Sequence, residues 1–168
     1  VGVEDSDDSG GHACWLQGGI ALTQVALDKA RTKAGRITLM HEVSHMWDWR
    51  LGDGKHTRSI NDGRFSKRSK GDLYLEIEAF AARDPKFEKF FSNILRSNKK
   101  DVVISRELFA KVMEIAHINS SLLMEELPNA AEYIQGLITE AGGTILLGRD
   151  GRGRARSSGT GRRGTPNG

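Results

Sequence analysis

Hydrophobic residues in the second half of the chain recur at helical spacing. The clearest stripe repeats every three or four residues and comprises Phe87, Phe90, Phe91, Ile94 and Leu95. Such spacing places all five side chains on one face of a helix. Asp84-Pro85 precedes the stripe and is a helix start signal, because Asp caps a helix N-terminus and Pro fits the first helical position. This pattern predicts a helix from Pro85 whose apolar face lies in the core.

The same periodicity, read with capping and stop signals, predicts four more helices. The first begins between Asp28 and Gly35 and ends near Leu51, and the second runs from about Leu73 to Arg83 and is capped by Asp72. The third is capped by Ser105. The fourth begins at Pro128 and ends at Gly142-Gly143. Residues 101–104 are predicted to be a short extended link. Residues 52–70 show no periodicity and are rich in Lys and Arg, so they are predicted to form a long basic loop.

The N-terminal part has a different pattern. Between His12 and Leu22, two short β-capable pieces are separated by Gly18-Gly19, which predicts a hairpin or two edge strands. The sequence therefore predicts an α+β fold, mostly α, with a small N-terminal β element.

Composition divides the 168 residues into three parts. Residues 1–11 are an acidic lead-in that we expect to be flexible. Residues 12–147 hold the apolar periodicity and are predicted to be one domain. Residues 148–168 contain six Arg and a single acid, and their charge of about +5 exceeds the net charge of +3 for the whole chain. Without apolar residues to bury, this Arg- and Gly-rich tail is predicted to be disordered.

Composition also excludes several classes of protein. No apolar run approaches the roughly 20 residues of a membrane span. Residues 1–8 lack the basic and apolar regions of a signal peptide. Cys14 is the single cysteine, which excludes an internal disulfide and a Cys-rich zinc module. A metal site in this chain must therefore use histidines and carboxylates.

One such site is indicated by His41-Glu42-Val43-Ser44-His45, an H-E-x-x-H motif within a predicted helix. Residues four apart share a helix face, so the His41 and His45 imidazoles can converge on one zinc ion. Glu42 points away from the ion and can act as general base toward metal-activated water.

This motif resembles that of the zincin metallopeptidases. The segment Glu78-Ala-Phe-Ala resembles the E-x-x-A segment of the gluzincin branch, and most closely that of the lethal-factor-like peptidases. The resemblance implies a zincin-like single domain whose zinc is held by His41, His45 and Glu78. It also implies that the strand around Gly19-Ile-Ala-Leu is an edge strand that binds an extended peptide. Tyr74, four residues before Glu78, can replace the active-site Tyr of that group.

The implied activity is zinc-dependent hydrolysis of peptide bonds, with one catalytic Zn²⁺, Glu42 as general base and a protein or peptide as substrate. Tyr74, His56 and His117 are candidates for the oxyanion donor. The resemblance to secreted toxin peptidases suggests a toxin or effector domain, secreted as part of a larger chain.

Several alternatives stay open. Glu76 or His56 can be the third ligand instead of Glu78. With His56, the chain is similar to the SprT-type, DNA-associated metalloproteases, and the basic loop and tail would contact nucleic acid. A third hypothesis is a non-catalytic domain in which zinc only stabilises the fold.

Overall fold

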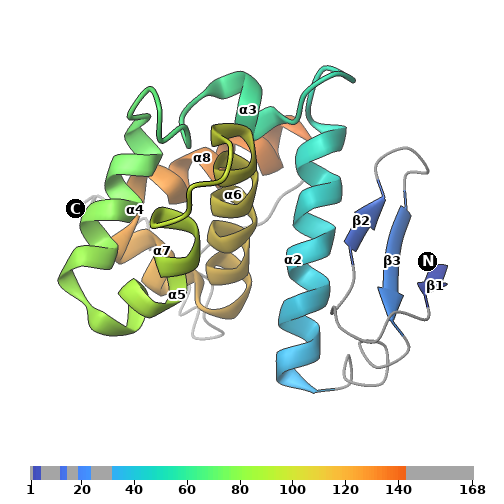
Figure 1. The fold of residues 1–168 in the computed structure, drawn as a ribbon, viewed down its shortest axis with the longest axis horizontal. Helices are drawn as coiled ribbons and strands as arrows, with labels where there is room; N and C mark the ends of the chain where they lie inside the picture. Colours follow the sequence, from blue (N-terminus) through green and yellow to red (C-terminus); the bar gives the residue numbers. More distant parts are fainter. Residues whose placement is uncertain (1, 5–11, 15–18, 24–31, 143–168) are drawn as a thin grey trace, which may run out of the picture.

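The computed structural model describes residues 2–4, 12–14, 19–23 and 32–142. Within residues 32–142, 76% of the residues are helical and none lies in a β-strand. The helices of this part are α2 (Lys33–Arg50), α3 (Arg58–Asp62), α4 (Asp72–Arg83), α5 (Pro85–Leu95), α6 (Asp101–Ile118), α7 (Ser120–Glu126) and α8 (Pro128–Glu140). We call residues 32–142 the helical body; α6 runs through it beside α2 (Figure 1).

The predicted α+β fold class is wrong, because the helical body packs without any sheet. The strands β1 (Gly2–Glu4), β2 (His12–Cys14) and β3 (Gly19–Thr23) are only three to five residues long and lie beside α2, on the side away from α6 (Figure 1). Strands this short cannot provide a layer on which seven helices pack. In the helical body, the buried apolar side chains come from the helices and their connections.

The predicted substrate-binding edge strand is also corrected. β3 lies in the middle of the small sheet, parallel to β1 on one side and antiparallel to β2 on the other. Gly19 and Ile20 pair with β2, Leu22 and Thr23 pair with β1, and Ala21 pairs with both. β3 is therefore the central strand rather than the edge strand that β-augmentation requires.

Several predicted helix boundaries are confirmed. Asp84 caps α5, since its Oδ1 accepts a hydrogen bond from the backbone N–H of Lys86 at 2.8 Å, and Pro85 is the first helical residue. Pro128 likewise opens α8. The helix with the H-E-x-x-H motif ends before Gly52, where a Cβ atom would lie 2.0 Å from the carbonyl oxygen of His56. Only glycine fits this close approach of two backbone segments.

Several local predictions are wrong. Asp72 is the first residue of α4 rather than its cap, and Gly71 occupies the N-cap position. Residues 101–104 are the first turn of α6 rather than an extended link, and Ser105 is buried within that helix rather than capping it. Asp101 in the first turn interacts favourably with the helix dipole, which allows the helix to begin earlier. The basic loop contains α3, and α7 was not predicted. The predictions for the tail and for most of the lead-in lie outside the described residues.

Helix α6 forms the centre of the core. Leu108, Phe109 and Val112 on this helix are fully buried. The Phe109 ring lies 6.2 Å from that of Trp47 on α2 and 6.1 Å from that of Phe65 in the connection before α4. These contacts hold α6 against α2. Among the described residues, no helix is both long and apolar enough to cross a membrane.

Asp48, near the end of α2, ties that helix to α3. Its side chain is fully buried and accepts hydrogen bonds from the Ser59 backbone N–H at 2.7 Å and the Ser59 hydroxyl at 2.6 Å. Burial raises the pKa of Asp48, and the hydrogen bonds from Ser59 oppose that shift. The role of this carboxylate is therefore to anchor the loop that follows the motif helix.

Replacing Asp48 by alanine should lower the free energy of unfolding by about 1–3 kcal/mol, because a buried backbone N–H loses its partner. Urea denaturation of the metal-free protein measures the change. Asp53 accepts backbone N–H bonds from Lys55 and His56 but is exposed, so Asp53→Ala is the control and should change stability less. Equal losses for the two variants would contradict the anchoring role of Asp48.

Candidate metal centre

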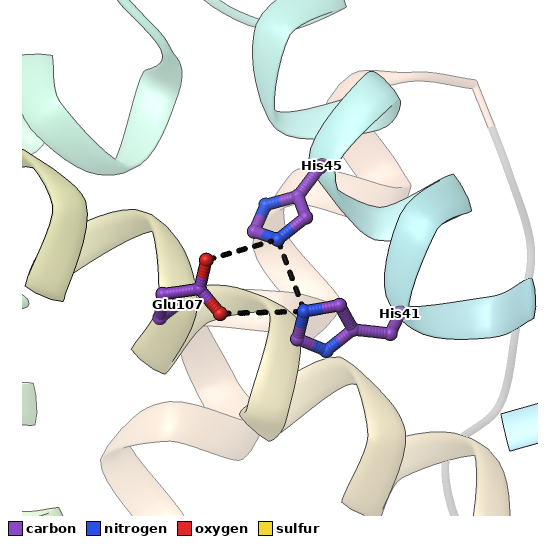
Figure 2. A group of neighbouring side chains, drawn as sticks. All are labelled: His41, His45 and Glu107. Carbon is purple, nitrogen blue, oxygen red and sulfur yellow. Dashed lines mark hydrogen bonds and ion pairs between the residues drawn. The ribbon is translucent and has the colours of Figure 1, made fainter. Parts of the chain in front are cut away.

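The two histidines of the motif face α6 (Figure 2). His41 and His45 lie one turn apart on α2, and both imidazoles point toward the carboxylate of Glu107 on α6. The Nε2 atoms of the histidines are 3.1 Å apart. Glu107 Oε2 lies 3.3 Å from His41 Nε2, and Glu107 Oε1 lies 3.5 Å from His45 Nε2. We call these three residues the His41/His45/Glu107 group. Among the described residues, they are the cluster of His and carboxylate side chains that could hold a metal ion.

The separations within this group suit zinc. Nitrogen and oxygen ligands bind zinc at about 2.0–2.2 Å in tetrahedral geometry, so pairs of ligand atoms are about 3.3–3.5 Å apart. The two Nε2 atoms are 3.1 Å apart, close to this spacing, but the histidines face different oxygens of Glu107, at 3.3 and 3.5 Å. One ligand atom from each residue lies within 4.8 Å of the others, so the carboxylate must turn to bind an ion together with both histidines. Two imidazoles and one carboxylate are also a donor set that zinc uses in catalytic sites, where a fourth position stays open.

A second carboxylate orients His41. Glu114 lies two helical turns after Glu107 and is 3% exposed, and its Oε1 is 2.5 Å from His41 Nδ1. Lys111 donates to both Glu114 oxygens at 2.9 and 3.0 Å. With its Nδ1–H donated to Glu114, neutral His41 presents the lone pair of Nε2 to the group, which is the tautomer that a metal ligand needs.

The charges of the group favour a cation between the two helices. Burial lowers the pKa of His41, but hydrogen bonds to Glu107 and Glu114 outweigh it and raise that pKa to about 9. Burial, together with the charge of His41, lowers the pKa of His45 to about 4. The hydrogen bond from His41 lowers the pKa of Glu107. Without metal, a protonated His41 therefore sits between two carboxylates.

The group is accessible from solvent. The Glu107 side chain is 32% exposed, whereas that of His45 is 8% exposed. His41 and Glu107 are among the residues that line a cavity of about 290 Å³. A substrate can therefore reach the side of the group formed by His41 and Glu107.

The predicted third ligand lies elsewhere. Glu78 is exposed on α4 and accepts a hydrogen bond from the Tyr74 hydroxyl at 3.0 Å. Tyr74 is itself 4% exposed, and burial raises its pKa to about 12. Glu76 accepts hydrogen bonds from the backbone N–H groups of Asn129 and Ala130, so it caps α8. The geometry therefore supports neither Glu78 nor Glu76 as ligand, nor Tyr74 as a catalytic residue.

The other predicted histidines are also outside the group. His56 is 58% exposed and its Nδ1 lies 3.9 Å from Asp53. His117 is exposed at the end of α6. Glu42, the predicted general base, lies next to His41 on α2 and is half-buried. The structure thus brings together His41 and His45 as predicted, with Glu42 adjacent in the helix.

Glu107 was missed in the sequence, although a signal for it exists. Glu107-Leu-Phe-Ala110 has the same E-x-x-A spacing as Glu78-Ala-Phe-Ala81. The predicted extended link at residues 101–104 and the cap at Ser105 placed Glu107 at a helix start, which hid its position on the face of a long helix. Glu114, seven residues later, lies on the same face and strengthens the signal.

Replacing Glu114 by glutamine should weaken zinc binding by about 10–100-fold, because the charge that orients His41 is lost. Competition with a fluorescent zinc chelator measures the dissociation constant. Glu125→Gln, an exposed glutamate on α7, is the control and should bind zinc like the wild type. The thermal unfolding midpoint of each metal-free protein is also measured. An unchanged midpoint shows that a loss of zinc affinity comes from the position of His41 and not from a less stable fold. Unchanged affinity in Glu114→Gln would show that Glu114 has no positioning role.

The chain matches no protein-family model, and comparisons with curated proteins and with solved structures find no match. A proposal for its function therefore rests on the motif and on the geometry of the His41/His45/Glu107 group.

Proposed function

We propose that this protein is a zinc-dependent metallopeptidase whose zinc is held by His41, His45 and Glu107, with Glu42 as general base. The observation that carries this proposal is the convergence of the H-E-x-x-H histidines on a carboxylate from another helix, at separations of 3.1–3.5 Å. Glu107 takes the place of Glu78 in the ligand set.

In the proposed mechanism, some residues hold the zinc ion and Glu42 transfers the proton. A zinc ion held by the group supplies a Lewis acid that activates water and polarises the carbonyl of a peptide bond. Glu42 accepts the proton of the attacking water and later donates it to the leaving amine. Glu114 holds His41 in the tautomer that leaves Nε2 free.

The accessibility of the site favours catalysis over a purely structural zinc. Structural zinc sites are closed by four protein ligands, whereas catalytic sites keep a position for water or substrate. Here three residues that could hold the ion converge, and His41 and Glu107 line a cavity. The alternative with His56 as ligand has less support, since His56 is exposed and lies outside the group.

The test is a cleavage screen with the purified chain. Metal-free protein is reconstituted with zinc, its metal content is measured, and it is incubated with a mixture-based peptide library analysed by mass spectrometry. We expect one zinc per chain and cleavage that stops on addition of 1,10-phenanthroline. Zinc binding without cleavage of any library peptide would contradict the proposed enzyme and favour a structural metal.

A further inference from the structure

The cavity beside the His41/His45/Glu107 group carries a strong charge pattern. Lys99 and Lys111 line it together with His41 and Glu107, and Asn93 and Ser97 add polar groups. Lys111 is ion-paired with Glu114, and its ammonium lies 4.5 Å from the centre of the Phe90 ring. Lys99 is exposed and close enough to Glu107 for its charge to act on that carboxylate, but no hydrogen bond or ion pair of its ammonium is seen within the helical body. Lys99 is therefore the cation of this cavity that is available to a ligand.

A second cavity shares part of its lining with the first. It has a volume of about 300 Å³ and shares Ser97, Lys99 and Ile104 with the first, and Lys67 and Arg68 also line it. We call the two together the basic groove. The Lys67 ammonium donates hydrogen bonds to the backbone carbonyls of Leu95 at 2.9 Å and Ser97 at 3.4 Å.

The wall of the basic groove is held in place by hydrogen bonds. Asp101, the one acid in the second cavity among the described residues, accepts hydrogen bonds from the Ser66 hydroxyl at 2.7 Å and the Arg68 backbone N–H at 2.9 Å. These hydrogen bonds connect the loop before α4 to the start of α6. The cations that line the second cavity are Lys67, Arg68 and Lys99, and Lys99 also lines the first.

We propose that the basic groove binds a carboxylate of a peptide substrate, with Lys99 as its principal partner, so that the protein cleaves next to acidic groups. This inference rests on the proposed function and names its substrate class. The first cavity, at about 290 Å³, has room for one amino-acid side chain and lies at the lower end of ligand pockets. An ammonium at such a position discriminates between a carboxylate and its neutral amide because only the carboxylate carries a negative charge and forms an ion pair with it.

Two sources of the carboxylate are distinguished by the peptides used. The first probe is acetyl-Ala-Ala-Glu-Ala-Ala-Ala-amide, whose only carboxylate is a side chain, and the second replaces Glu by Gln. A third, with Gln and a free C-terminus, carries only a terminal carboxylate. Binding is measured by calorimetry with zinc-loaded Glu42→Gln protein, and cleavage is measured with the wild type.

We expect a carboxylate peptide to bind about 10-fold or more tightly than the fully neutral peptide. Lys99→Ala should abolish that preference, and Lys99→Glu should reverse it in favour of a peptide with Lys in place of Glu. Lys100→Ala is the matched control: the neighbouring lysine is also exposed but lines neither cavity, so the preference should stay.

The two proposals fail in different ways. If carboxylate peptides bind with the expected preference but are not cleaved by the wild type, the peptidase is contradicted while the basic groove stands. If peptides are cleaved without regard to charge, or if Lys100→Ala removes the preference as Lys99→Ala does, the groove proposal is overturned. Tighter binding of a single-stranded oligonucleotide, lost in Lys99→Ala, would also overturn it by assigning the groove to nucleic acid.

Discussion

Replacing Glu107 by alanine is expected to weaken zinc binding by more than about 100-fold. A negatively charged ligand is lost, and the remaining pair of histidines cannot close a three-ligand site. Glu107 is the carboxylate 3.3 Å from His41 Nε2 and 3.5 Å from His45 Nε2, and its side chain is partly exposed, so the substitution should leave the fold intact. The dissociation constant is measured by chelator competition, and zinc content by mass spectrometry.

Glu78→Ala is the matched control for this experiment. Glu78 lies in a segment with the same E-x-x-A spacing but is exposed on α4, where it contacts Tyr74. Its loss should change the zinc dissociation constant by less than about twofold. Glu107→Gln keeps the size of the side chain and removes only its charge, so it should fall between wild type and Glu107→Ala. A larger loss of zinc affinity in Glu78→Ala than in Glu107→Ala would show that Glu78 on α4, and not Glu107, is the third ligand.

Glu42→Gln should reduce peptide cleavage by about 10²–10⁴-fold while zinc stays bound at a stoichiometry near one. Glutamine keeps the shape of the side chain but cannot accept the proton of the attacking water. The loss should appear in kcat/KM measured on a peptide found in the library screen. The zinc dissociation constant should change far less than in Glu107→Ala, because Glu42 is not part of the His41/His45/Glu107 group.

Tyr74→Phe provides the control for loss of a proton-donating side chain outside the group. The Tyr74 hydroxyl donates to Glu78 on its own helix, so cleavage should be unchanged in that variant. Full activity in Glu42→Gln would contradict the mechanism. A large loss in Tyr74→Phe, with zinc still bound, would show that the catalytic residue predicted from the resemblance acts in this protein after all.

Much of the helical body could be predicted from local signals. The Asp84-Pro85 start, Pro128 and the apolar stripe of α5 act within one or two turns, so sequence neighbours alone determine them. The predicted α+β fold class was wrong because it, too, was inferred from local signals alone. Short β-capable pieces predict strands, but they do not reveal whether a sheet becomes a layer of the core, which depends on contacts distant in sequence.

The start of α6 shows how one local error affects a site. Ser105 is a good N-cap residue, and the cap prediction at this position moved the helix start by five residues. In the structure Ser105 is buried within α6, and Asp101 occupies the first turn. Burial of Ile104 in the core stabilises the longer helix and outweighs the capping preference of one serine.

The sequence by itself determined that His41 and His45 share a helix face with Glu42 beside them, since a spacing of four residues needs only the helix period. It did not determine the third member of the group. Glu78 and Glu107 both occur in helical E-x-x-A segments, and local pattern cannot rank them. The tertiary structure decided between them because buried side chains of α6 pack against α2, which carries Glu107 to the histidines, whereas α4 packs against α5 and α8 and leaves Glu78 in solvent.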